Sequence, residues 1–104
     1  METANRYIDT HFRKNPSLRE ISAAVGLSSC YFHQVYAKVT GETPKDRINR
    51  LRMDEAKRML LDGARAGEVA KALRFSSLTY FYLVFKQRVG VGPERWARTH
   101  VKSQ

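Results

Sequence analysis

The stretch PKDRINRLRMDEAKRMLL, residues 44–61, decides how the rest of the chain is arranged. One helical face is marked by residues at three- and four-residue spacing, which are Ile48, Leu51, Arg52, Ala56, Met59 and Leu60. Pro44 suits a first helical turn, where a backbone N–H would have no partner, and Gly63 follows the last periodic residue as a stop. The sequence therefore predicts one long helix, which would span roughly 27 Å at about 1.5 Å per residue. Because Arg52 lies in the apolar stripe, we expect it to brace helix ends.

Three helices are predicted before this stretch, and a tight turn separates the second from the third. Residues 4–14 carry a first helical stripe, which Asn15 and Pro16 end. Ser17 and Glu20 stand at the spacing of a capping box, in which each side chain satisfies the other residue's backbone N–H. A second, short helix should therefore begin at Ser17, and Gly26 then supplies a left-handed turn without a Cβ clash.

A third helix should follow this turn, with Ser28 as its N-cap and Gly41 at its end. Its inward positions are predicted to be Phe32, Val35, Tyr36 and Val39. Its outward stripe is predicted to be Cys30, His33, Gln34 and Ala37. Two short helices around a glycine turn, the second with a polar outward face, describe a helix-turn-helix unit.

The chain repeats this pattern after the long helix. Glu20-Ile21 aligns with Glu68-Val69, Ser28-Ser29 with Ser76-Ser77 and, after one inserted residue, Tyr31-Phe32 with Tyr80-Phe81. The glycine and proline that follow the first unit, Gly41 and Pro44, are matched by Gly90 and Pro93. The second unit should have a support helix near residues 67–73 and an outward-facing helix near 77–89. A last short helix should bring Trp96 into the core.

The net charge of the chain indicates what kind of partner it binds. Nineteen lysine and arginine residues against ten aspartate and glutamate residues give the 104-residue chain a net charge of +9, which indicates a polyanionic partner.

The composition and motifs also exclude several classes of protein. The single cysteine, Cys30, excludes an internal disulfide and argues against structural zinc. No metal cluster, cofactor motif or nucleophile–base pair is recognisable, so we expect neither an enzyme nor a cofactor. Without a membrane-length apolar run or a leader, the chain is expected to be cytoplasmic.

On these residues, the sequence resembles the DNA-binding domain of the AraC/XylS family of bacterial transcription regulators. The resemblance covers nearly the whole chain and lies in the paired blocks LREISAAVGLSSCYF and GEVAKALRFSSLTYF, the central RINRLRMDEAKRMLL and the closing FKQRVGVGPERW. The closing block is the most diagnostic, because the family typically ends its second unit as this chain does with Phe85, Lys86, Gly90, Pro93 and Trp96.

The resemblance implies an all-α fold of seven helices, in which a long central linker helix joins two helix-turn-helix subdomains. The corresponding ranges are 1–43 for the first unit, 44–62 for the linker and 63–104 for the second unit. It further implies that two recognition helices enter adjacent major grooves of double-stranded DNA, and that the protein regulates transcription, often as an activator. RNA polymerase and an N-terminal effector or dimerisation domain outside this chain are the other partners it implies.

The resemblance also assigns candidate contacts by position. Base edges would be contacted by Cys30, His33 and Gln34 in the first unit and by Leu78, Thr79, Tyr82 and Leu83 in the second. Phosphates are expected to meet exposed cations and the N–H groups at helix starts, at Ser17, Ser28, Lys38, Ser76, Lys86, Arg88, Arg95 and Arg98. The second base-contacting stripe offers few donors, so a helical protein-interaction module using that apolar stripe is the alternative function.

Three departures from the family pattern bear on the fold. Arg74 stands at a turn position that is usually glycine, so the turn must be left-handed at a cost of about 1 kcal/mol or adopt another geometry. Arg65 opens a support helix where a polar cap is more usual, and Arg47 occupies a position that is commonly aromatic. The changes at Arg74 and Arg65 should weaken the second unit.

Overall fold

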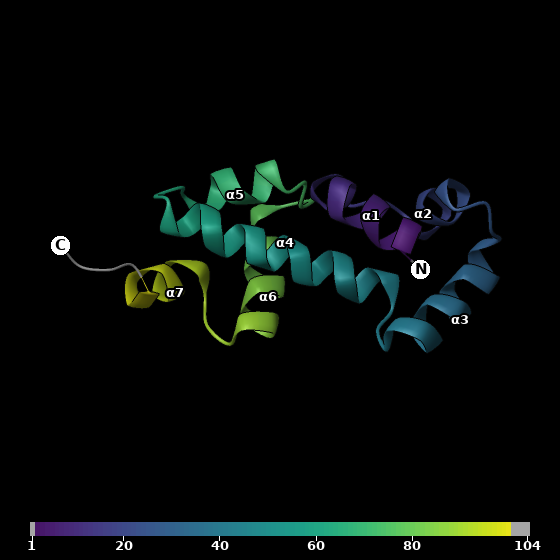
Figure 1. Ribbon diagram of the computed structural model, residues 1–104. Coiled ribbons are helices and arrows are strands. Elements are labelled where there is room, and N and C mark those ends of the chain that lie inside the picture. The colour runs from purple at the N-terminus through teal and green to yellow at the C-terminus, as the bar shows by residue number, and fades with distance from the viewer. Residues whose placement is uncertain (1, 101–104) are drawn as a thin grey trace. The chain divides into compact units, whose positions relative to one another are not determined.

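A computed structural model describes residues 2–100, and these residues contain helices but no strand. The helices of the first part of the chain are α1 (Glu2–His11), the short 3-10 helix η1 (Phe12–Lys14), α2 (Leu18–Ala24) and α3 (Ser29–Thr40). They are followed by α4 (Pro44–Leu61), α5 (Ala66–Ala72), α6 (Leu78–Val89) and α7 (Pro93–His100) (Figure 1). The predicted all-α fold of seven helices is therefore confirmed over the described residues. None of these helices is both long and apolar enough to span a membrane.

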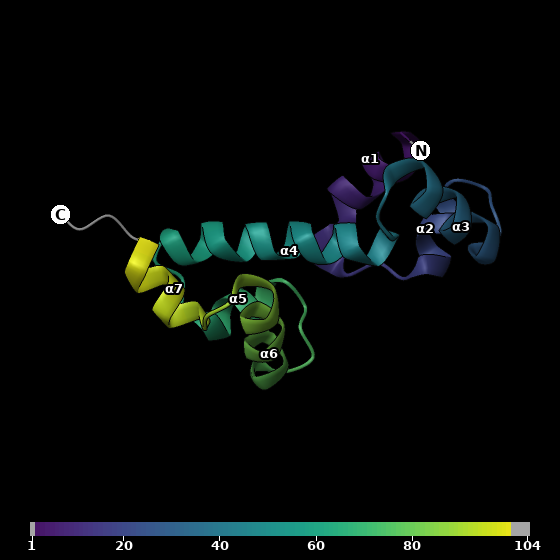
Figure 2. The ribbon, with the colours of Figure 1, turned by 90° about the horizontal axis from the view of Figure 1, so that it is seen from below.

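The chain divides into two compact units, residues 1–51 (unit 1) and residues 52–104 (unit 2). The division falls inside α4, which is a single uninterrupted helix of 18 residues (Figure 2). In unit 1, α2 packs against α1 and α3, and in unit 2, α6 packs against α5 and α7. Each unit thus has its own helix-turn-helix and receives part of its core from its own half of α4.

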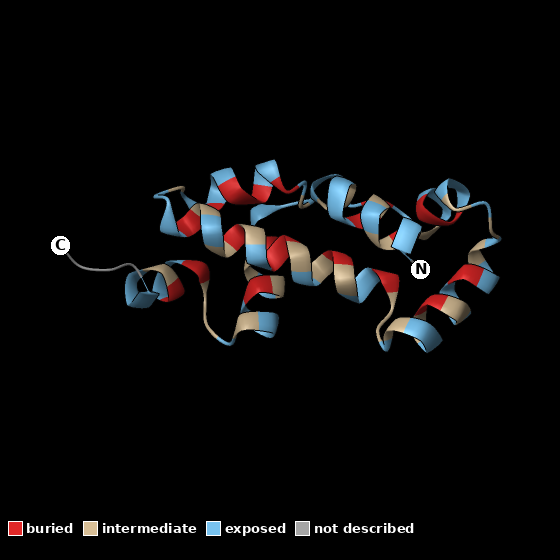
Figure 3. Cartoon of the chain, in the orientation of Figure 1, coloured by how far each residue is buried: buried red, intermediate tan, exposed pale blue. Residues whose placement is uncertain are grey.

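Unit 1 is built around a small aromatic and aliphatic core. Its buried members are Ala4, Ile8, Ile21, Phe32, Tyr36 and Ile48, which come from α1, α2, α3 and α4. Figure 3 shows buried positions in red on each of these helices. Tyr36 is fully buried, and its hydroxyl donates a hydrogen bond of 2.5 Å to Asn5 Oδ1. Burial raises the pKa of Tyr36, so the phenol stays a hydrogen-bond donor that ties α3 to α1.

Unit 2 has a larger core that α7 closes. Its buried members are Met53, Ala56, Leu60, Ala66, Val69, Ala70, Leu73, Phe81, Phe85 and Trp96. Phe85 lies edge-on to Trp96 with ring centroids 6.1 Å apart, an arrangement that favours aromatic pairs. The prediction that Trp96 closes the core of the second unit is therefore confirmed.

Arg52 is buried, with only 3% of its surface exposed. Its Nη2 donates to the backbone carbonyl of Leu73 at 2.8 Å, and its guanidinium carbon lies 3.9 Å from the centre of the Phe75 ring. Burial lowers the pKa of Arg52, because the charged form loses hydration. Arg52 therefore fixes the end of α5 to α4, which confirms that it braces helix ends within the protein.

The N-caps predicted for the second and third helices of unit 1 are confirmed. Ser17 N–H donates to Glu20 Oε1 at 3.0 Å, and Glu20 N–H donates to Ser17 Oγ at 3.1 Å, which completes the capping box. The hydrogen bond from the Ser17 backbone lowers the pKa of Glu20. At the start of α3, Ser28 Oγ accepts from Tyr31 N–H at 3.3 Å, and Gly41 ends this helix at a φ of 81°. These bonds fix where α2 and α3 begin.

One prediction about the helix-turn-helix units was wrong, and one was confirmed. Val39 was predicted to face inward, but it is 65% exposed, and the buried residues of α3 are Phe32 and Tyr36. The outward-facing helix of unit 2 was predicted near residues 77–89, and α6 (Leu78–Val89) confirms it, with Ser77 as its N-cap, whose Oγ accepts from Tyr80 N–H at 3.0 Å. The turn before α6 is therefore one residue longer than the turn before α3.

The departures at Arg74 and Arg65 have visible consequences in unit 2. Arg74 has a φ of 60°, so the turn does adopt the left-handed conformation that favours glycine. Arg65 is the N-cap of α5 and makes no capping hydrogen bond with its side chain, although its own N–H donates to Glu68 Oε1 at 2.8 Å. Only half of the reciprocal cap seen at Ser17 is thus present in unit 2.

Replacing Arg65 with serine should stabilise unit 2 by about 1 kcal/mol, because a hydroxyl at this N-cap can accept the Glu68 N–H as Ser17 accepts that of Glu20. Thermal unfolding should show a rise in midpoint of roughly 4–8 °C. Arg65→Ala is the matched control, since it removes the same charge and offers no acceptor. An equal gain from the alanine variant would mean that charge, and not capping, limits the start of α5.

Candidate nucleic-acid interface

The predicted outward stripe of α3 lies on the surface of unit 1. Cys30, His33 and Gln34 are all exposed, and their spacing of three and four residues puts them on one helical face. The buried residues Phe32 and Tyr36 occupy the opposite face and hold α3 against α1 and α2. The structure therefore brings the three predicted base-contacting residues of the first unit together, with their polar groups in solvent.

The residues of the corresponding stripe on α6 differ in exposure. Leu78, Thr79 and Leu83 are exposed, with 44% of Leu78 and 53% of Leu83 accessible. Tyr82 is only partly exposed, and its hydroxyl donates a hydrogen bond to Glu94 Oε2 at the start of α7. This bond to Glu94 raises the pKa of Tyr82. Within the free protein the Tyr82 hydroxyl is therefore engaged, and the exposed part of this face is mainly apolar.

The predicted phosphate-contacting cations all lie on the surface. Lys38 lies in the last turn of α3, Lys86 and Arg88 lie in the last turn of α6, and Arg95 and Arg98 belong to α7. Residues 52–104 hold eleven lysines and arginines against five carboxylates, for a net charge of +6, whereas residues 1–51 hold eight against five, for +3. The excess of positive charge is thus larger in unit 2, where the predicted stripe on α6 has few hydrogen-bond donors.

The predicted serine contacts have different surroundings. The Ser17 and Ser28 hydroxyls both accept backbone N–H groups of the helices that they cap, so any phosphate would meet the remaining N–H groups of these first turns. Ser76 is exposed but lies one residue before the cap of α6. The N-cap of α6 is Ser77, and the phosphate contact predicted at Ser76 stays a prediction.

Two contacts of α4 in unit 1 were not found by sequence analysis. Arg47 donates from Nε and Nη2 to Asp9 Oδ1 at 3.2 and 2.8 Å and so joins α4 to α1. Arg50 Nη2 lies 2.8 Å from Glu42 Oε2, next to the loop between α3 and α4. Position 47, which is commonly aromatic in the family, is thus occupied by an arginine that makes an ion pair. The residues of the pair at Arg47 are 38 positions apart, so no local pattern could reveal it.

Comparison with known proteins agrees with this geometry. A family model described as "Helix-turn-helix domain" matches residues 21–99. The chain is 33% identical over 91 residues to "Uncharacterized HTH-type transcriptional regulator YisR" of Bacillus subtilis, an alignment that covers 86% of this chain and 32% of that protein. It is 33% identical over 97 residues to "Regulatory protein PocR" of Salmonella typhimurium, covering 92% of this chain and 32% of PocR. The chain thus spans about a third of the length of these curated relatives.

A solved structure has the same fold. The C-terminal domain of AraT, a response regulator from Geobacillus stearothermophilus, superposes with a TM-score of 0.89 at 25% identity, covering 97% of this chain and 85% of that one. The relatives are named as regulators, which agrees with the expectation that this chain is a regulator and not an enzyme. The family model, the relatives and the two helix-turn-helix units lead to one assignment. The chain belongs to the AraC/XylS family of bacterial helix-turn-helix transcriptional regulators.

Proposed function

We propose that the chain binds specific sequences in double-stranded DNA by inserting α3 and α6 into adjacent major grooves. The observation that carries this proposal is the duplicated helix-turn-helix, in which both second helices expose the stripe that would meet base edges. The net charge of +9 supports a polyanionic partner. The 18-residue α4 would span roughly 27 Å, a length comparable to the roughly 34 Å between successive major-groove faces.

The two units should contribute in different ways. In the first unit, Gln34 can pair bidentately with adenine N6 and N7, and His33 can donate to guanine or to a phosphate. In the second unit, Leu78 and Leu83 suit the methyl groups of thymine. The net charge of +6 on unit 2 suits phosphate anchoring. We therefore assign most hydrogen-bonded specificity to unit 1, and apolar contact and backbone affinity to unit 2.

The same proposal extends to regulation in the cell. Binding beside a promoter would place the chain in the bacterial cytoplasm, where RNA polymerase is the partner that an activator must influence. We propose activation, as the family resemblance implies, together with an effector or dimerisation domain as a further partner. A promoter fusion measures the sign directly, since an activator raises reporter output when the protein is expressed and a repressor lowers it.

A salt titration tests DNA binding without knowledge of the operator. For random and for genomic duplex fragments, the logarithm of the association constant should fall linearly with the logarithm of the salt concentration. The slope should be about −5 if roughly six phosphates are contacted. Lys86→Gln should reduce the magnitude of this slope by about 1. Lys71→Gln, an exposed lysine outside the predicted contacts, is the matched control and should leave the slope unchanged. Equal effects of the two variants would reject Lys86 as a phosphate contact.

One observation favours a second candidate function. Leu78, Tyr80 and Leu83 of α6 expose 44%, 46% and 53% of their surfaces, and grouped apolar side chains often mark a protein-binding face. A helical protein-interaction module would use this face and would have negligible affinity for both kinds of duplex. The same titration therefore separates the two candidates.

A further inference from the structure

The two stripes that would meet base edges differ at one pair of equivalent positions. The alignment that brings the second unit onto the first pairs His33 of α3 with Tyr82 of α6. The same alignment pairs Lys45 with Glu94, each of which directly follows the proline that starts a helix. These positions therefore carry a histidine and a lysine in unit 1, and a tyrosine and a glutamate in unit 2.

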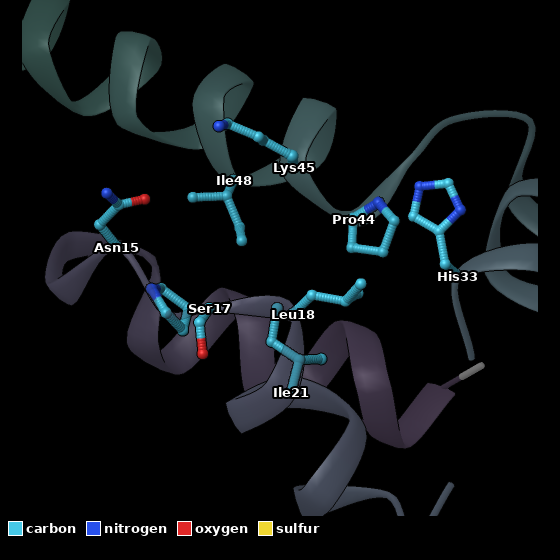
Figure 4. A pocket seen from close by; sticks show the side chains of 9 residues that line it. Asn15, Ser17, Leu18, Ile21, His33, Pro44, Lys45 and Ile48 are labelled. Carbon is cyan, nitrogen blue, oxygen red and sulfur yellow. The ribbon is translucent and has the colours of Figure 1, made fainter. Parts of the chain in front are cut away.

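In unit 1, the chemistry of this pair leaves the α3 stripe open. His33 and Lys45 line one hollow beside α3, and no carboxylate is among the described residues that line it (Figure 4). A lysine ammonium carries donors and no acceptor, so Lys45 cannot accept a hydrogen bond from the His33 ring. The two side chains also extend in different directions in Figure 4. Since His33 is exposed, its ring can turn its nitrogens to a base edge.

In unit 2, a hydrogen bond joins the corresponding pair. The Tyr82 hydroxyl donates to Glu94 Oε2, and the Tyr82 ring packs against the core beside Phe81, with ring centroids 6.3 Å apart. Glu94 lies in the first turn of α7, where the positive end of the helix dipole favours the charged carboxylate. The bond raises the pKa of Tyr82, so the phenol keeps the proton that it donates.

The position of Glu94 does not depend on this bond. Its neighbours in α7, Pro93 and Trp96, are buried, and Trp96 lies edge-on to Phe85 of α6. The core thus holds the first turn of α7 against α6 and keeps the carboxylate within reach of Tyr82. Because Glu94 itself is exposed, its replacement should leave this packing intact.

A base could take the Tyr82 hydroxyl only by breaking the bond to Glu94. Tyr82 follows Leu78 and Thr79 by four and three residues, so it belongs to the face of α6 that would meet DNA. Its present acceptor is charged, and hydrogen bonds to charged groups are roughly twice as strong as those between neutral groups. Base edges offer neutral acceptors. Exchange of Glu94 for a base is therefore unfavourable.

We propose that Glu94 is a specificity-determining residue of unit 2, which withholds the Tyr82 hydroxyl from base edges so that DNA meets the Tyr82 ring and the exposed apolar residues of α6. The inference rests on the proposed function, because it requires α6 to enter a major groove. If the bond served only to fasten α7 to α6, base preference would not depend on it. Base preference therefore separates the two roles.

The hydrogen bond is tested first, on the complete chain and in the absence of DNA. Glu94→Ala should lower the pKa of Tyr82, because the acceptor that holds its proton is gone. An NMR titration of labelled tyrosine measures this pKa, and Tyr82→Phe identifies the resonance among the five tyrosines. Asp54→Ala, which removes an exposed carboxylate from α4 in the same unit, is the matched control and should leave the pKa of Tyr82 unchanged. An unchanged pKa in Glu94→Ala would overturn the hydrogen bond.

Base preference is then compared by selection from one pool of random-sequence duplexes at constant salt. In the otherwise unchanged chain, Tyr82→Phe should alter preference by less than twofold at every selected position. In the Glu94→Ala background, it should alter preference at one position by about two- to tenfold, the range for one hydrogen bond between neutral groups. In the Asp54→Ala background, the effect should stay below twofold. Preference is the measure, because loss of any carboxylate raises affinity for every duplex.

The outcomes separate this inference from the proposed function. Equal effects of Tyr82→Phe with and without Glu94→Ala, in a chain that does select DNA, would overturn Glu94 as a specificity-determining residue and leave the proposed function standing. If the chain selected no duplex at all, the proposed function would fail and the inference with it, whereas the NMR titration would still show whether Glu94 holds the hydroxyl.

Discussion

Replacing Gln34 with alanine should reduce affinity for the cognate operator by about 1–3 kcal/mol, roughly 5- to 150-fold, and relax base preference at one position. The side chain is exposed on the outward face of α3, opposite the buried residues Phe32 and Tyr36. Truncation therefore removes an amide that can pair with adenine N6 and N7 without disturbing the core of unit 1. Binding to an operator and to its single-base variants, with salt held constant, measures the change.

Two further variants test whether the loss of base preference is specific to Gln34. Gln87→Ala removes an exposed amide from α6 outside the predicted stripe, so it should change neither affinity nor base preference. Leu83→Ala should cost less than Gln34→Ala, because contact with a thymine methyl distinguishes bases less strongly than a bidentate hydrogen bond. If Leu83→Ala relaxed base preference more than Gln34→Ala, the assignment of specificity to unit 1 would be wrong.

Local chemistry explains why much of the fold could be predicted from the sequence. The capping box at Ser17 and Glu20 depends on residues three positions apart, and Gly41 at a φ of 81° depends on a single residue that lacks a Cβ. Such signals act within one turn, so the order and number of helices follow from them. The second outward-facing helix, predicted near residues 77–89, is α6 (Leu78–Val89), and a serine caps its start as Ser28 caps α3.

Contacts between distant residues explain what the sequence could not predict. The partner of Tyr82 is Glu94, twelve positions later on another helix, and it engages a hydroxyl that had been assigned to base contact. Asp9 similarly accepts both hydrogen bonds from Arg47 across 38 positions. The exposed stripe of α3 could be predicted because a helical period determines it, whereas the occupied hydroxyl on α6 depends on where α7 packs. The exposure of the predicted stripe was thus better predicted on α3 than on α6.

The largest effect on stability should come from Arg52→Ala, which we expect to destabilise unit 2 by about 3 kcal/mol. The change leaves the Leu73 carbonyl without its donor, at roughly 1–3 kcal/mol, and removes the cation–π contact with Phe75, at roughly 0.5–2 kcal/mol. It also removes the buried stem of a residue that is 3% exposed, which leaves a cavity next to α5. Denaturant unfolding, with hydrogen exchange to locate the weakened amides, measures the loss.

Arg52→Met separates packing from charge. Methionine keeps most of the stem volume and removes a guanidinium whose Nε is buried without a hydrogen-bond partner in the described structure, so a desolvation cost disappears together with the Leu73 bond. The methionine variant should therefore lose only about 1 kcal/mol. Hydrogen exchange should show the weakening in α5 and in the turn at Arg74, whereas the amides of α1 and α2 in unit 1 should keep their protection. Equal losses for alanine and methionine would mean that the charge itself, held between Leu73 and Phe75, stabilises the turn on which α6 depends.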